Sequence, residues 1–195
     1  MSLIAANRIS YTINNKKLFH NLSFTIDAGS ALHIKGGNGS GKSTLLRILL
    51  GITTPSKGKI ELLKPNTKIT YLGHKNAIKN YLTPIENLKL IFHQSNLESA
   101  FDWFQRLGLS RVQDEISANL SFGQQKKLAL IRVLAAPADL IVLDEPFVGL
   151  DDSSRNLLNK YLQESISTGS SLALTSHIRP EIISKELMLE NFSND

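Results

Sequence analysis

Apolar residues occupy every second position in residues 9–13 and again in residues 22–26. A period of two is typical of strands that bury one face and expose the other. The polar cluster at residues 14–17 between the two stretches favours a turn. The beginning of the chain therefore predicts paired antiparallel strands.

A continuous apolar run at residues 31–34 predicts a buried strand, and a glycine-rich loop at residues 36–41 follows it. Residues 43–50 are leucine-rich, and they predict a helix that Gly51 and Pro55 end. The order is therefore strand, flexible loop and helix.

The middle of the chain changes to helical signals. Thr83, Pro84 and Glu86 combine a capping residue, a proline at the first helical position and a capping-box acid. Residues 95–98 repeat the capping-box pattern, so we expect a second helix to start there. Residues 83–119 predict a small helical lobe. Its aromatic residues would suit a cofactor or a stacked base, but their helical spacing favours core packing: Phe92, Phe101, Trp103 and Phe104.

Helix and strand signals alternate in the last third of the chain. We expect a helix at 121–136, a strand at 140–143, a helix at 153–167 and a strand at 171–175. Such alternation indicates an α/β fold with a mostly parallel sheet flanked by helices. We expect one domain, with a core formed by residues 1–82 and 120–195 and a helical subdomain at about 83–119.

The composition of the 195 residues is that of a folded globular chain, with 42% hydrophobic and 20% charged residues. A net charge of +5 favours anionic partners. The absence of cysteine excludes a disulfide framework, a thiolate nucleophile and a zinc site built from cysteine. No run approaches the ~20 apolar residues of a membrane span, and residues 1–10 lack a secretion signal.

Residues 36–43 fit the pattern G-x-x-x-x-G-K-S between a strand and a helix. Glycines let backbone N–H groups turn inward around phosphate oxygens, and the following helix adds its positive end. Lys42 would reach the β- and γ-phosphates, while the Ser43 hydroxyl would bind Mg²⁺. The alternative is a loop that only turns the chain. The candidate nucleotide-binding residues are Gly36, Gly37, Asn38, Gly39, Ser40, Gly41, Lys42, Ser43 and Thr44.

The apolar strand at 140–143 ends in two acids, Asp144 and Glu145. Buried carboxylates are costly without cationic partners, so they indicate a site. Asp144 is a candidate for the Mg²⁺ shell, through water, and Glu145 for the base that deprotonates an attacking water, an effect of roughly 10²–10⁴-fold. The alternative is helix capping, which Pro146 disfavours because it restricts the preceding residue.

Residues 120–125, Leu-Ser-Phe-Gly-Gln-Gln, resemble the signature peptide of ATP-binding-cassette (ABC) ATPases. The two motifs above resemble other motifs of the same family. Ser121 and Gln124 also fit a capping box, and both interpretations can hold together. The resemblance implies the P-loop ABC fold, ATP and Mg²⁺ as ligands, and a head-to-tail homodimer formed on ATP binding. In that dimer the signature residues face the partner subunit's ATP: Ser121, Phe122, Gly123 and Gln124.

The same resemblance assigns further roles. Tyr11 matches the aromatic residue that stacks on adenine, with core packing as the alternative. The segment Gly149, Leu150 and Asp151 matches the loop that crosses the dimer interface. His177 matches the switch histidine at the γ-phosphate, and His74 stands where most ABC ATPases have a glutamine that senses Mg²⁺ and the attacking water.

Residues 71–74 and 82–88 resemble the ATP-binding subunit of the haem exporter used in cytochrome c maturation. Three positions depart from the usual pattern: Lys75, Phe122 and Val148. The resemblance implies integral membrane subunits as partners, a cytoplasmic position on the inner face of the membrane, no nucleic acid and no haem bound directly. Candidate contacts to the membrane subunit are Ile78, Tyr81 and Leu82. The alternatives are a subunit of another ABC importer or exporter, a soluble ABC ATPase acting on nucleic acid, and a degenerate nucleotide-binding regulator.

Overall fold

The computed structural model describes residues 2–14 and 16–189, and five α-helices and eight strands lie within them. The strands are β1 (Ser2–Ile13), β2 (Lys16–Asp27), β3 (Ala31–Lys35), β4 (Lys57–Leu62), β5 (Ile69–Leu72), β6 (Leu140–Asp144), β7 (Ser171–Thr175) and β8 (Lys185–Met188). The helices are α1 (Lys42–Leu49), α2 (Pro84–Ile91), α3 (Gln94–Arg106), α4 (Phe122–Leu134) and α5 (Asp152–Ser167).

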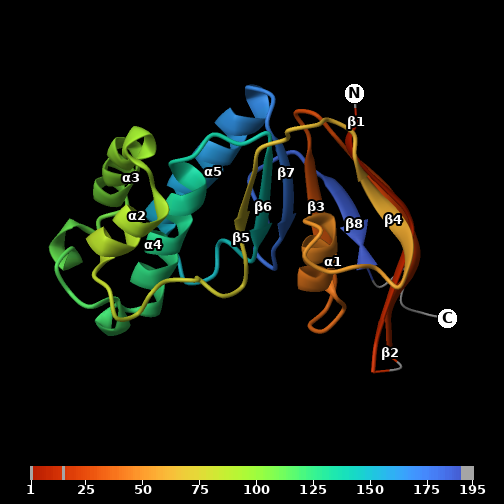
Figure 1. Cartoon of the computed structure of the whole chain (residues 1–195), viewed down its shortest axis with the longest axis horizontal. Helices are drawn as coiled ribbons and strands as arrows, with labels where there is room; N and C mark the ends of the chain where they lie inside the picture. The colour runs from red at the N-terminus through yellow and green to blue at the C-terminus, as the bar shows by residue number, and fades with distance from the viewer. Residues whose placement is uncertain (1, 15, 190–195) are drawn as a thin grey trace.

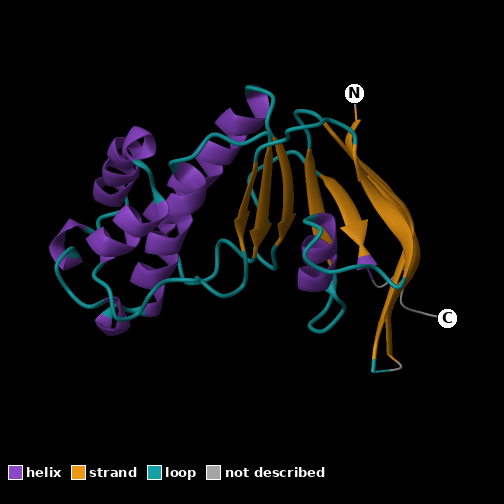
Figure 2. Cartoon of the chain, in the orientation of Figure 1, coloured by secondary structure: helices purple, strands orange, loops and turns teal. Residues whose placement is uncertain are grey.

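Two sheets organise the chain. Five parallel strands pair in the order β5-β6-β7-β3-β8, and three antiparallel strands pair in the order β2-β1-β4. Figure 1 shows α1 between the two sheets and α2, α3, α4 and α5 on the other side of the parallel sheet. Colouring by secondary structure separates an all-strand end from an all-helix end (Figure 2). The expected α/β fold, with antiparallel strands at the N-terminus, is confirmed.

The parallel sheet buries both faces, as the continuous apolar run of β6 predicts. Leu140 and Val142 contact the core formed with β1, β2 and α1, whereas Ile141 and Leu143 contact the core formed with the helices on the opposite side. Each of these side chains is at most 1% exposed, and such burial contributes about 1.5–3 kcal/mol per residue. The sheet is therefore a rigid base for the residues at its edge.

Two of the expected helix starts are confirmed and one is wrong. Thr83 caps α2 in a capping box with Glu86, and Ser121 caps α4 in the same way with Gln124. The helix start expected at residues 95–98 is wrong, because α3 already begins at Gln94 with His93 at the N-cap. The chain returns to helical geometry directly after the extended His93, so residue 95 lies inside the first turn.

The aromatic residues of the helical segment belong to the core. Phe92, Trp103 and Phe104 are buried, and the Trp103 ring meets Tyr161 edge-on at 5.7 Å between centroids. The packing interpretation of these side chains is confirmed. Within the described residues no helix is long and apolar enough to cross a membrane.

Candidate functional site

An open cleft of about 450 Å³ lies where β3, β6 and β7 end and α1 begins. The carboxyl edge of a parallel sheet is where α/β proteins bind ligands, because loops from several strands meet there. The cleft is lined by Leu18, Asn38, Gly39, Gly41, Lys42, Ser43, Thr44, His74, Asp144, Glu145, Val148 and His177.

The glycine-rich loop and the start of α1 are suited to bind an anion in this cleft. α1 begins at Lys42 after Gly41, and no side chain in the described part of the chain caps its first N–H groups. Gly41 has a φ of 95°, and a Cβ there would lie 3.1 Å from Leu18 Cβ, so glycine suits both the conformation and the space. The Lys42 ammonium donates to the carbonyls of Gly36 at 2.7 Å and Gly37 at 3.1 Å. Free helix N–H groups beside a fixed ammonium suit a chain of phosphates.

The two acids at the end of β6 are buried and fixed by the neighbouring strand. Asp144 is 1% exposed and accepts a hydrogen bond from the Thr175 hydroxyl at 2.6 Å. Glu145 is 8% exposed, and its N–H donates to the same hydroxyl at 3.0 Å. Its φ of 48° is in the left-handed region, a strained conformation typical of functional positions. The helix-capping alternative for this pair is wrong, because residues 146–149 form a turn and the next helix, α5, begins at Asp152 with Asp151 as its cap.

His177 joins the glycine-rich loop to these acids. Its backbone N–H donates to Glu145 Oε2 at 3.1 Å, and its Nε2 lies 3.6 Å from Glu145 Oε1 and 3.5 Å from the Lys42 ammonium. The preceding residue is held in turn, because the carbonyl of Ser176 accepts from His33 Nε2 at 3.0 Å. Burial lowers the pKa of His33, which favours the neutral ring. The loop therefore presents His177 at a fixed place in the cleft.

The acids leave oxygens free for a metal. Within the described residues, Asp144 Oδ2 and Glu145 Oε1 are buried and accept no hydrogen bond. An unsatisfied buried carboxylate oxygen calls for a cation or water. Mg²⁺ usually takes only one or two protein ligands and completes its shell with waters and phosphate oxygens. Asp144 and Ser43 line one cleft and fit such a site.

The segment at residues 120–125 lies away from this cleft. Ser121 is exposed, its hydroxyl accepts from the Gln124 N–H at 3.2 Å, and neither residue lines the cleft of its own chain. Phe122 covers Gly149, where a Cβ would come within 2.5 Å of its ring. Because Gly149 has a φ of 81°, both space and conformation require glycine there.

The loop after Gly149 is tied to α4 by a charge pair. Asp151 caps α5 by accepting from the Ser154 N–H at 2.8 Å, and its other oxygen accepts from the Lys127 ammonium at 2.5 Å. These contacts hold the pKa of Asp151 at about 2. The buried Leu150 anchors the loop between them. The segments 121–124 and 149–151 therefore lie side by side.

The structure brings together most of the residues that the sequence singles out. Gly36, Gly37 and Ser40 belong to the loop without lining the cleft, and Tyr11 packs on Phe19 with 6.2 Å between the ring centroids. Sequence reasoning missed the cleft residues Leu18 and Val148, and also Thr175, which holds both acids. In the sequence, the only signal at Val148 was its departure from the usual pattern of the ABC ATPases.

This fold and cleft define a P-loop nucleotide-binding domain of the ATP-binding-cassette class. The profile of the family described as "ABC transporter" matches residues 19–148. Solved structures agree on the fold: a dimeric bacterial ABC transporter cassette aligns with a TM-score of 0.75, at 21% identity over 90% of this chain and 88% of that chain. A putative ABC transporter ATP-binding protein from Pyrococcus furiosus aligns with a TM-score of 0.79, at 21% identity over 98% and 99%.

Curated sequences narrow the assignment. The chain is 37% identical to the cytochrome c biogenesis ATP-binding export protein CcmA of Idiomarina loihiensis, over 90% of this chain and 85% of that protein. It is 34% identical to the protein of the same name from Rickettsia felis, over 95% and 98%. The chain therefore belongs to the ABC transporter family, among the ATP-binding subunits of the CcmA type.

Proposed function

We propose that this chain hydrolyses ATP as the nucleotide-binding subunit of an exporter that serves cytochrome c biogenesis. One observation carries the ATPase part: Lys42, Glu145 and His177 converge in one cleft at the N-terminus of α1. The names of the CcmA relatives support the exporter and its role in cytochrome c biogenesis.

The roles of the cleft residues follow from their chemistry. The loop from Gly36 to Thr44 binds the phosphates, with Lys42 on the β- and γ-phosphates. Mg²⁺ supplies charge neutralisation to the phosphates when bound, and Ser43 and Asp144 hold it, Asp144 through water. Glu145 orients and deprotonates the attacking water. His177 contacts the γ-phosphate, His74 senses the metal and the water from the facing loop, and Tyr11 stacks on adenine.

A second copy of the chain completes each site. Ser121, Phe122, Gly123 and Gln124 would face the ATP of the partner subunit, and Gly149, Leu150 and Asp151 would cross the interface. Support comes from the exposure of Ser121 away from its own cleft and from the N-terminus of α4 beside it, which attracts anions. Two ATP molecules would then be bound between two chains.

Membrane subunits supply the transport path in this proposal, and the chain binds them at the cytoplasmic face of the membrane. The candidate contact segment contains Ile78, Tyr81 and Leu82. Tyr81 is 71% exposed, while Asn87 holds the backbone beneath it by accepting from the Lys79 N–H at 2.8 Å and donating to the Lys79 carbonyl at 3.0 Å. An exposed aromatic ring on a firmly held loop suits a protein contact. We also keep the division into a core and a helical subdomain at residues 83–119 as a proposal.

Two experiments test this function. Purified protein should release phosphate from ATP in the presence of Mg²⁺, and Glu145→Gln should abolish turnover while retaining ATP binding. Undiminished turnover in that variant would refute the catalytic assignment.

For the exporter, purification from native membranes in mild detergent should recover integral membrane subunits, identified by mass spectrometry, with a haem spectrum in the complex. Co-purified membrane subunits of a transporter with another cargo would keep the ATPase and overturn the role in cytochrome c biogenesis.

A further inference from the structure

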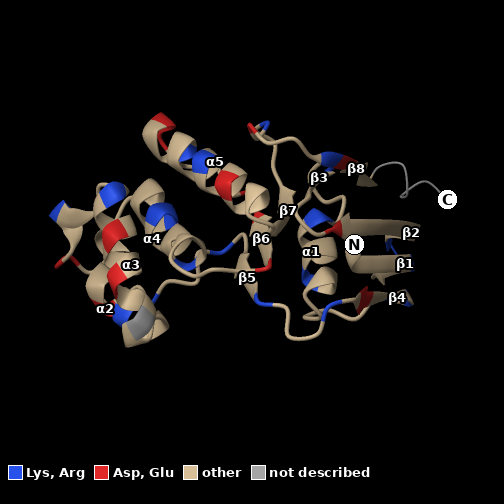
Figure 3. Ribbon diagram, turned by 90° about the horizontal axis from the view of Figure 1, so that it is seen from above, with Lys and Arg blue, Asp and Glu red and all other residues tan. Residues whose placement is uncertain are grey.

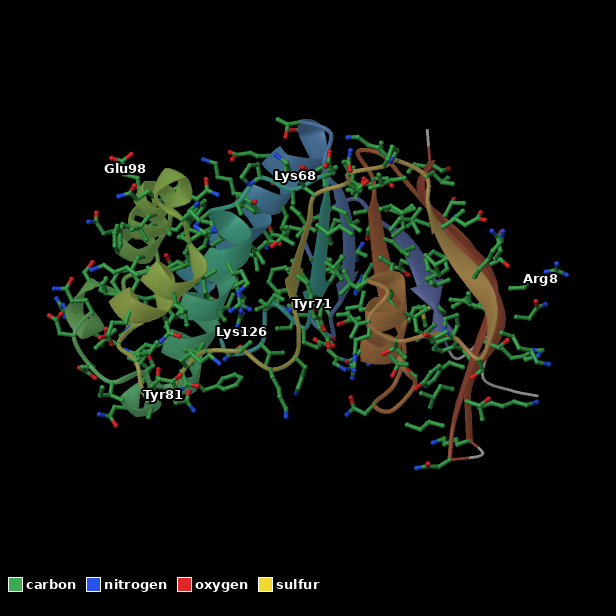
Figure 4. All side chains as sticks on the ribbon, in the orientation of Figure 1. Arg8, Lys68, Tyr71, Tyr81, Glu98 and Lys126 are labelled. Atoms are coloured by element: carbon green, nitrogen blue, oxygen red, sulfur yellow. The ribbon has the colours of Figure 1, made fainter. Side chains whose placement is uncertain are left out.

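His33 is the one polar residue in the apolar run at residues 31–34 of β3, and it is 1% exposed. Leu32 and Ile34 contact the core formed with β1, β2 and α1, so alternation along the strand directs the His33 ring to the opposite face of the sheet. Packed side chains cover both faces of the parallel sheet (Figure 4). A buried imidazole at this place needs a hydrogen-bond partner, because a buried polar group without one costs free energy.

The partner of the His33 ring is the backbone directly after β7. His33 Nε2 lies 3.0 Å from the carbonyl oxygen of Ser176. Because a carbonyl oxygen only accepts, Nε2 carries the proton and donates it. β3 lies between β7 and β8 (Figure 3), and its pairing with β7 ends where Ile34 meets Thr175. The imidazole therefore links the two strands one residue beyond their last pair.

The Ser176 carbonyl belongs to the turn that presents His177. The Ser176 hydroxyl donates to the Ile178 carbonyl at 2.6 Å and accepts from the Ile178 N–H at 3.0 Å, so the residues on both sides of His177 are bonded to each other. The His177 N–H donates to Glu145 Oε2 at 3.1 Å. The turn is thus closed on itself, and the bond from His33 fixes it to the sheet.

β3 also leads into the phosphate loop. It ends at Lys35, and the carbonyl of the next residue, Gly36, accepts from the Lys42 ammonium at 2.7 Å. The same ammonium lies 3.5 Å from His177 Nε2. The strand that carries the phosphate loop therefore also carries the side chain that holds the turn of His177, and His33 fixes the spacing between the two.

We propose that His33 is a positioning residue that sets the place of His177 relative to Glu145 and the phosphate loop, acting through the carbonyl of Ser176. The inference rests on the proposed function, in which His177 contacts the γ-phosphate. His33 does not line the nucleotide cleft itself. A residue of this kind changes how fast bound ATP reacts more than how tightly ATP binds.

Two amide variants separate the hydrogen bond from the bulk of the ring. His33→Gln places an amide donor close to the position of Nε2, whereas the amide of His33→Asn is one methylene too short to reach the Ser176 carbonyl. His33→Asn should lower kcat by about 10–100-fold with KM changed by less than about twofold, and His33→Gln should restore most of the rate. A wild-type kcat in His33→Asn would overturn the proposal.

Amide hydrogen exchange at His177 gives a readout that needs neither nucleotide nor ATPase activity. Measured by NMR in EDTA, the His177 N–H should exchange about tenfold faster in His33→Asn than in wild type, and at nearly the wild-type rate in His33→Gln. Unchanged exchange in His33→Asn would refute the contact. If exchange follows the predicted order in a protein that does not hydrolyse ATP, the contact is supported and the proposed function is wrong.

Ser171→Ala is the matched control for a general loss of stability. Ser171 is fully buried on β7, and its hydroxyl donates to the Asp27 carbonyl at 3.1 Å, at the end of the strand away from the cleft. This variant loses a bond of the same kind, so it should lower the Tm while kcat and the exchange at His177 stay at wild-type values. If Ser171→Ala slowed turnover and accelerated the exchange at His177 as His33→Asn does, His33 would have no specific positioning role.

Discussion

Thr175 is the residue whose removal should most directly disturb the acids without touching the nucleotide. It is fully buried on β7, opposite Asp144 in the parallel register. Its hydroxyl donates to Asp144 Oδ1 at 2.6 Å and accepts from the Glu145 N–H at 3.0 Å. Thr175→Val keeps the shape and removes both hydrogen bonds.

The expected loss follows from these two bonds. A buried hydrogen bond to a charged group contributes about 1.5–3 kcal/mol, and a neutral one about 1 kcal/mol. The Glu145 N–H still reaches the Thr175 carbonyl at 3.1 Å, so the second loss is partial. We expect a decrease of about 3 kcal/mol in the free energy of unfolding, or about 6–12 °C in Tm. Thermal and guanidinium unfolding measure it.

A matched variant controls for the change in polarity. Thr70 is a buried threonine on β5, and its side chain makes no hydrogen bond within the described residues. Thr70→Val should therefore cost less than about 1 kcal/mol. If Thr175→Val were no more destabilising than Thr70→Val, the Thr175 hydroxyl would not hold the acids and the reasoning would be wrong.

Three further predictions concern other parts of the chain. Lys42→Ala should weaken binding of a fluorescent ATP analogue by about 100-fold or more, because it removes charge-assisted phosphate contacts, and an unchanged affinity would contradict the loop assignment. The lowered pKa of Asp151, about 2, means that its charge stabilises the fold above pH 4 and ceases to do so as the pH falls toward 2. Because the Asp151 side chain is 56% exposed, screening by solvent limits the effect to about 1 kcal/mol. The difference in unfolding free energy between wild type and Asp151→Asn should therefore vanish as the pH falls from 4 to 2. A difference that stays constant over this range would contradict the stabilising role of the Asp151 charge. Asn87→Leu should cost about 1–3 kcal/mol in denaturant unfolding at unchanged ATP affinity, because it leaves the part-buried Lys79 N–H unpaired and removes the side-chain bonds to the Lys79 and Thr83 carbonyls. A loss below about 0.5 kcal/mol would contradict this network.

Features encoded by neighbouring residues were predictable from the sequence. The phosphate loop depends on glycines and a lysine at fixed short spacing, and the caps at Thr83 and Ser121 depend on a partner three residues later. The start expected near Ser95 failed for a related reason. The same short pattern occurs inside helices, and only the extended backbone at His93 decides where α3 begins.

Features that depend on strand order were not predictable. Thr175 meets Asp144 because β6 pairs with β7, and nothing in either segment states that pairing. Lys126 carries the same lesson, since a lysine in a basic helix looks like a solvated residue until the fold buries it to 3% exposure. Strands β4, β5 and β8 were missed because their segments lack a clear period of two.

The mass of the Glu145→Gln variant tests most directly whether two chains bind ATP between them. Light scattering should give a monomer of 21.6 kDa without nucleotide and twice that mass with Mg²⁺ and ATP. Ser121→Arg in the same background should remain monomeric, because a bulky cation would block the proposed contact. A Glu145→Gln protein that binds ATP and still has the mass of one chain would contradict the account.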